Sequence, residues 1–147
     1  MQKKMDQKTR LYGRRKGRPL GMHRKTLMDT FLPQVCLTLP EQGKLNLSEC
    51  CHTKSVWMEI GFGAGEHLIQ QALAHPEVMF IGCDAFENAV ASLLQKIEKN
   101  NVKNIFIFQD DARKLVDVLP DHAIERLFIL FPDPWPKARH HKRRLLQ

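Results

Sequence analysis

The chain has 147 residues, about the length of one domain, and a formal net charge of +7. No run approaches the roughly 18 apolar residues of a membrane-spanning helix, and the first residues lack the apolar region of a secretory signal, so a cytoplasmic protein is expected. Four cysteines without a C-x-x-C pair, and a Cys50-Cys51-His52 cluster whose spacing matches no common zinc pattern, predict neither a disulfide framework nor a metal site.

The charge is concentrated at the two ends of the chain. Residues 1–25 hold ten Lys and Arg with one acid, and residues 137–147 hold five with none, whereas residues 26–136 hold eight against fifteen acids. Basic ends on an acidic body are typical of proteins that handle a polyanion such as nucleic acid, although a solvated tail has the same composition. We therefore expect a basic arm over 1–25 and one domain over 26–147. A helix is predicted over about 26–37, with Pro33 near its start or breaking it.

A strand, a glycine-rich turn and a helix are predicted over residues 54–73. The apolar strand ends near Glu59, and Gly61, Gly63 and Gly65 follow it. Glycines at such a turn supply backbone conformations that other residues avoid, and they let the backbone approach a ligand closely. A tight turn without a ligand has the same pattern, so the loop alone is weak evidence.

Two further strands are predicted to end in acids. The strand over 78–83 ends at Asp84 and precedes a helix over about 87–100, and the strand over 104–108 is followed by Asp111 and another helix. A carboxylate after the second strand can accept both hydroxyls of a ribose, and one after the third can accept an adenine amino group. With Glu59, these acids predict a nucleoside across the carboxyl edge of a sheet of order 3-2-1-4. Each acid taken singly could instead be a helix N-cap.

A buried fourth strand over 123–130 leads into the segment FPDPWPKARHHKRR, residues 131–144. Its prolines are predicted to hold Asp133 and Trp135 in extended conformations beyond the end of the strand. A fixed carboxylate beside a flat ring suits a planar base, and the basic residues from Lys137 onward suit phosphates. A proline-rich surface turn followed by a solvated basic run is the alternative.

The glycine loop favours S-adenosylmethionine over a nicotinamide dinucleotide. The dinucleotide fingerprint G-x-G-x-x-G would need a third glycine where this chain has Glu66. A pyrophosphate would also lie close to the acids Glu59 and Glu66. S-adenosylmethionine carries an amino group and a sulfonium, which acids around the loop would favour.

Together with the basic GRRKGRPL segment, these motifs resemble the bacterial tRNA (guanine-N7)-methyltransferases, a class I S-adenosylmethionine-dependent family. The resemblance implies a Rossmann-like α/β fold with a mostly parallel sheet, and methylation of a tRNA guanine, in that family the variable-loop guanosine. It implies that Asp133 is the active-site acid and that Lys137 contacts the tRNA. The residues predicted to bind the cofactor are Glu59, Gly61, Asp84, Asp111 and Asp133.

Members of that family continue with further strands and helices beyond the point that matches Gln147. The resemblance therefore implies a methyltransferase domain truncated after its fourth strand. The alternative to an active enzyme is a non-catalytic fragment that keeps RNA or cofactor binding, and a nicotinamide oxidoreductase is a more distant one.

Overall fold

The computed structural model describes residues 11–50, 52, 55–130 and 132–146. Within these ranges the strands and helices follow the α/β alternation predicted from the sequence. The strands are β1 (Val56–Ile60), β2 (Met79–Cys83), β3 (Ile105–Phe108) and β4 (Arg126–Ile129). The helices are α1 (Met22–Thr30), α2 (Leu32–Val35), α3 (Glu66–Ala74), α4 (Glu87–Asn100) and α5 (Ala112–Val116), with 3-10 turns η1 (Leu47–Glu49) and η2 (Ala138–Arg143).

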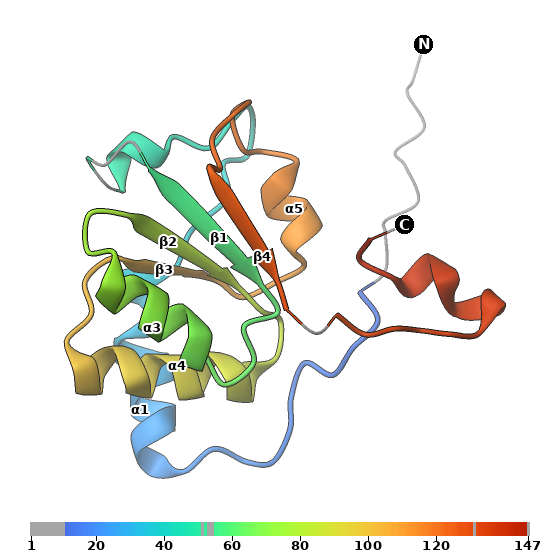
Figure 1. The fold of residues 1–147 in the computed structure, drawn as a ribbon. Coiled ribbons are helices and arrows are strands. Elements are labelled where there is room, and N and C mark those ends of the chain that lie inside the picture. The colour runs from blue at the N-terminus through green and yellow to red at the C-terminus, as the bar shows by residue number, and fades with distance from the viewer. Residues whose placement is uncertain (1–10, 51, 53–54, 131, 147) are drawn as a thin grey trace.

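The four strands form one parallel sheet of order β3-β2-β1-β4, so the predicted order and direction are confirmed. Met58 at the centre of β1 lies opposite Ile81 on one side and Leu127 on the other. Parallel strands need long crossovers, and helices supply these here on both faces of the sheet. Figure 1 shows α3 and α4 on one face and α5 on the other.

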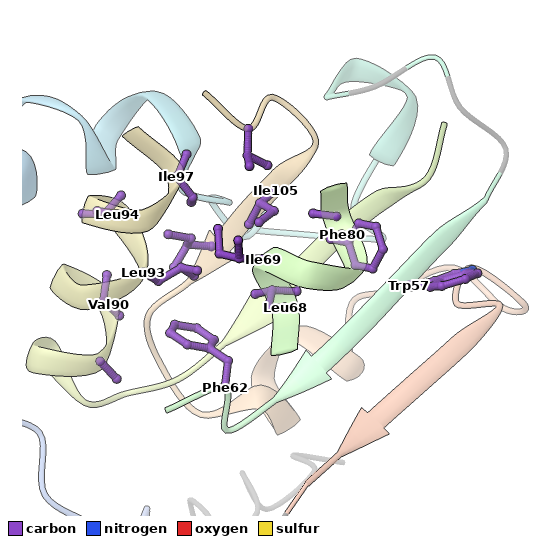
Figure 2. Packing of buried hydrophobic residues seen from close by; sticks show 14 of the residues in the cluster. Trp57, Phe62, Leu68, Ile69, Phe80, Val90, Leu93, Leu94, Ile97 and Ile105 are labelled. Carbon is purple, nitrogen blue, oxygen red and sulfur yellow. The ribbon is translucent and has the colours of Figure 1, made fainter. Parts of the chain in front are cut away.

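Each face of the sheet buries its own apolar cluster. Side chains alternate along a strand, so Trp57 and Phe80 face α3 and α4, while Met58 and Met79 face α5. Figure 2 shows the first cluster, in which Phe62 points toward residues of α3 and α4. The two clusters fix the sheet between its helical layers and so hold the carboxyl ends of the strands at one edge.

The fourth strand differs from its prediction. β4 begins only at Arg126, and Leu127 is 53% exposed rather than buried. The physical reason is its position, because in the described part of the chain β4 pairs with β1 alone. Trp57 anchors it by donating from Nε1 to Glu125 at 2.8 Å and by lying 4.4 Å from the Arg126 guanidinium.

The predicted helix over 26–37 is two shorter helices. α1 starts at Met22, four residues early, and packs its buried Leu27 in the cluster shared with α4. α2 begins afresh with Pro33 in its first turn, where proline costs no backbone hydrogen bond. None of the described helices is both long enough and apolar enough to span a bilayer.

Candidate functional site

A cavity of about 470 Å³ lies at the carboxyl ends of the strands. This is the edge at which open parallel sheets bind ligands, because loops diverge there toward opposite faces. The walls come from six parts of the chain that are far apart in sequence. The lining residues are Leu11–Arg14; Ile60 and Gly61; Cys83–Phe86; Asp110–Arg113; Ile129, Leu130, Pro132, Asp133 and Trp135; and Arg143 with Leu145.

The glycine-rich loop enters the cavity at Gly61. Gly61, Gly63 and Gly65 have φ of 73°, 56° and 82°, the left-handed region that side chains disfavour. At Gly65 a Cβ would also lie 2.7 Å from a methyl carbon of Leu93, so the loop packs directly on α4. The sequence prediction that these glycines serve backbone conformation is confirmed.

Asp84 joins the loop to the cavity. One of its carboxylate oxygens accepts from the Gly63 N–H at 3.1 Å and the other from the Phe86 N–H at 2.9 Å. Burial raises the pKa of Asp84, and these two backbone hydrogen bonds oppose that rise. Each carboxylate oxygen can accept a second bond, so Asp84 retains acceptor capacity toward the cavity that it lines.

Asp111 is buried at the start of α5. Its carboxylate caps the helix by accepting from the Arg113 N–H at 3.0 Å, and it also accepts from the Arg113 guanidinium. Burial favours the neutral acid, but the bonds from Arg113 outweigh it and lower the pKa of Asp111. The N-cap alternative therefore holds for Asp111, although the residue also lines the cavity.

Asp110 was not singled out from the sequence, yet it also lines the cavity. Burial opposes its ionisation, but the hydrogen bond from Lys114 and the charges of Lys114 and Arg15 lower the pKa of Asp110. Its carboxylate lies 2.6 Å from Lys114 Nζ and 3.4 Å from the Arg15 guanidinium. No local pattern signals the Arg15 contact, because it joins residues 95 positions apart.

Glu59 lies outside the cavity lining. It is 2% exposed and hydrogen-bonds through Oε2 to His67 Nδ1 at 2.7 Å, below the first turn of α3. The His67 ring in turn lies 5.0 Å from Phe128 of β4. The structure therefore brings Asp84, Asp111 and Asp133 together around the cavity and leaves Glu59 buried beside His67 of α3. That Glu59 contacts a cofactor stays a prediction.

Asp133 and Lys137 are both exposed, and only Asp133 lines the cavity. Lys137 instead lies at the start of η2. Contact of these residues with cofactor and tRNA stays a prediction.

The extended conformation predicted for Trp135 is wrong, because its φ is 38°. Arg144 donates to the carbonyls of Pro134 and Trp135, at 3.0 and 3.2 Å, and these bonds hold Trp135 in a conformation other than the extended one that a following proline favours.

Arg143 connects Trp135 to the basic arm. The Arg143 guanidinium lies 5.0 Å from the Trp135 ring and 4.7 Å from the ring of Tyr12. Arm residues are fixed further along by Asn88 of α4, which accepts from the Gly17 N–H at 2.8 Å and donates to the Arg18 carbonyl at 2.7 Å. Arg143 is one of the basic residues that were expected to suit phosphates, whereas Tyr12 was not predicted as a site residue, since the composition of the arm indicated only its charge.

Comparison with known proteins gives the following similarities. Residues 53–147 match the model of a protein family described as "Putative methyltransferase". A tRNA (guanine-N(7)-)-methyltransferase of Rhodospirillum rubrum is 46% identical over 155 residues, covering 100% of this chain and 60% of the relative. One of Caulobacter sp. strain K31 is 48% identical over 139 residues, covering 94% and 60%. The chain thus spans about 60% of the length of these curated relatives. Among solved structures, an rRNA methylase of Streptococcus thermophilus aligns with 66% of this chain and 55% of its own, at 16% identity and a TM-score of 0.46.

Proposed function

The chain belongs to the methyltransferase family whose model it matches, and on that premise we propose that it transfers a methyl group from S-adenosylmethionine to N7 of a guanine in tRNA. The relatives that carry this name support the substrate. The observation that carries the proposal is the convergence of the glycine loop, Asp84 and Asp133 on one cavity at the carboxyl edge of the sheet.

The residues around the cavity fit this cofactor. Asp84 has acceptor capacity for ribose hydroxyls, and Gly61 offers backbone without a side chain at the cavity wall. Glu66 occupies the first turn of α3, where a dinucleotide would place its pyrophosphate, and the buried Glu59 lies just behind. These acids disfavour a phosphate and favour the amino group of S-adenosylmethionine. When bound, the cofactor supplies an electrophilic methyl group.

For this reaction the main role of the protein is to position the guanine and the cofactor. Guanine N7 is an acceptor at the edge of the base and carries no proton, so no general base is needed. Asp133 can accept hydrogen bonds from the imino and amino groups of guanine, and its negative charge offsets the positive charge that develops on the purine. Trp135 forms a wall of the same cavity, where an aromatic ring can stack on a base.

The arm supports the tRNA part of the proposal. Its described residues carry Arg14, Arg15, Lys16 and Arg18, and Leu11–Arg14 line the cavity opposite the strand ends. Cations beside a base-binding cavity neutralise the phosphates of the nucleotide that enters it. Because tRNA is the proposed substrate, the proposed place of action is the cytoplasm.

Two measurements on the 147-residue chain test the proposal. Calorimetric titration is expected to show binding of S-adenosylhomocysteine and none of NAD. Incubation with S-adenosylmethionine and unmodified tRNA, followed by nucleoside analysis, is expected to yield 7-methylguanosine. Binding of S-adenosylhomocysteine without product would indicate a cofactor-binding fragment, and absence of both would overturn the proposal.

A further inference from the structure

Helix α4 reaches the glycine-rich loop through two side chains that lie outside the cavity. Lys96 Nζ donates to the Ala64 carbonyl at 2.8 Å, and Ser92 Oγ donates to the same oxygen at 3.3 Å. Lys96 also donates to Ser92 Oγ at 2.9 Å, so the three groups form a closed set. None of these residues lines the cavity.

The tip of the loop depends on polar contacts. Phe62 on one side is buried in the cluster below α4, and Gly65 on the other packs on Leu93. Between them Gly63 and Ala64 are both exposed and bury no apolar side chain. Glycine loses more conformational freedom on ordering than any other residue, so this stretch needs specific bonds to keep one conformation.

Two sets of side chains supply such bonds. Asp84 accepts from the Gly63 N–H, and Lys96 with Ser92 donates to the Ala64 carbonyl. The Asp84 carboxylate faces the cavity, where under the proposed function it also receives the ribose hydroxyls. The Lys96 contact involves only residues outside the cavity lining, so a ligand in the cavity does not compete for it.

We infer that Lys96, assisted by Ser92, is a positioning residue for the cofactor loop, an inference that rests on the proposed function. Its ammonium holds the loop in the binding conformation before the cofactor arrives. The ordering cost of the loop is then met during folding rather than on binding, which strengthens the affinity for the cofactor. Lys96 suits this task because its side chain is half-buried on α4 and ends in a charged donor, which makes a stronger hydrogen bond than a neutral donor.

A purely structural role for Lys96 predicts something different. If the bond to Ala64 served only to stabilise α4, its loss would lower the unfolding temperature and leave the affinity of the folded protein for the cofactor unchanged. A positioning role predicts a lowered affinity with little change in the unfolding temperature, because the exposed loop tip contributes little to global stability.

The test compares Lys96→Met, Lys96→Arg and Lys99→Met in the 147-residue chain. Lys99 is exposed on the same helix, which makes the identical substitution there a matched control. S-adenosylhomocysteine affinity is measured by calorimetry and stability by thermal unfolding. Lys96→Met is expected to weaken binding by about tenfold, Lys96→Arg to restore most of it, and Lys99→Met to leave it unchanged.

Several outcomes would overturn the inference. They are unchanged affinity in Lys96→Met, whatever its unfolding temperature, and equal weakening in Lys99→Met. If Lys96→Met does not fold, Ser92→Ala decides, with about threefold weaker binding expected and unchanged binding contradicting the inference. A wild-type chain that binds no S-adenosylhomocysteine would overturn the proposed function itself, which separates the two failures.

Discussion

Arg113 holds the carboxylate of Asp111 two positions before it in the chain, with Nε donating to both oxygens at 2.9 and 3.0 Å. The contact depresses the pKa of Asp111 in the folded protein. A carboxyl group whose pKa is lowered by folding stabilises the folded protein. This stabilisation is fully present above the pKa of the unfolded state and is lost as the pH falls through the pKa of the folded state.

Arg113→Met is therefore expected to lower the free energy of unfolding at neutral pH by about 1 kcal/mol. The difference from the wild type should shrink as the pH falls through the depressed pKa of Asp111. Urea unfolding at a series of pH values measures this. Lys114→Met, which removes the more exposed pair with Asp110, serves as the control and should cost less, about 0.5 kcal/mol. A pH-independent loss in Arg113→Met would contradict the assignment.

Asp84→Asn is expected to weaken S-adenosylhomocysteine binding by about tenfold or more, because ribose hydroxyls bond more strongly to a carboxylate than to an amide. Burial raises the pKa of Asp84, so wild-type affinity should fall on acidification at a higher pH than for an ordinary aspartate. Calorimetry across the acidic range should show this fall in the wild type and none in Asp84→Asn. Identical profiles for the two proteins would remove Asp84 from the ribose site.

Asp133→Ala is expected to abolish methyl transfer while weakening cofactor binding far less, because Asp84 and the glycine loop remain. Single-turnover transfer to unmodified tRNA, measured beside S-adenosylhomocysteine affinity, separates the two effects. Asp121→Ala, in the exposed turn that precedes β4, is the matched control and should retain turnover. Near-normal turnover in Asp133→Ala would show that this carboxylate neither orients the base nor offsets its charge.

The basic arm is expected to set the salt dependence of tRNA binding. Arg14→Ser and Lys16→Ser remove exposed cations without touching the bonds from Asn88, and each should flatten the log–log salt slope by about 0.7–0.9. Lys103→Ser, in the loop between α4 and β3 at the opposite end of the sheet, should leave the slope unchanged. If all three variants had the same slope as the wild type, the arm residues would be solvated and would make no contact with tRNA phosphates.

The parts of the fold predicted from sequence are those with strong local signals. Helix α4 begins at Glu87 and ends at Asn100 as predicted, because its apolar positions recur at helical spacing and Asn101 takes the left-handed conformation that ends it. β4 was predicted to begin too early and to be buried, because an apolar run of residues does not show that the strand pairs with a neighbour on one side only. Trp135 was misjudged because the bonds from Arg144 override a local preference.

The residues of the site likewise fall into those that the sequence predicts and those that it does not. Gly61, Asp84 and Asp111 follow strand ends, so their meeting at one edge could be predicted from the parallel order. Glu59 instead lies within β1, one residue before its end, and its side chain hydrogen-bonds to His67 of α3. The contacts of Arg15 with Asp110 and of Arg143 with Tyr12 depend on how the two basic ends fold over the sheet, which no spacing in the sequence encodes.

The sheet order also has a consequence for synthesis of the chain. β1 is central in the sheet, yet its partner on one side, β4, follows much later, with Trp57 paired to Arg126 some 69 positions on. On the ribosome β1, β2 and β3 can assemble while that side of β1 is still a bare edge, with Trp57 and Met58 uncovered by their final neighbours. An open strand edge can pair with another chain, which leads to aggregation. During this interval a chaperone that binds nascent chains would therefore shield the bare edge of β1.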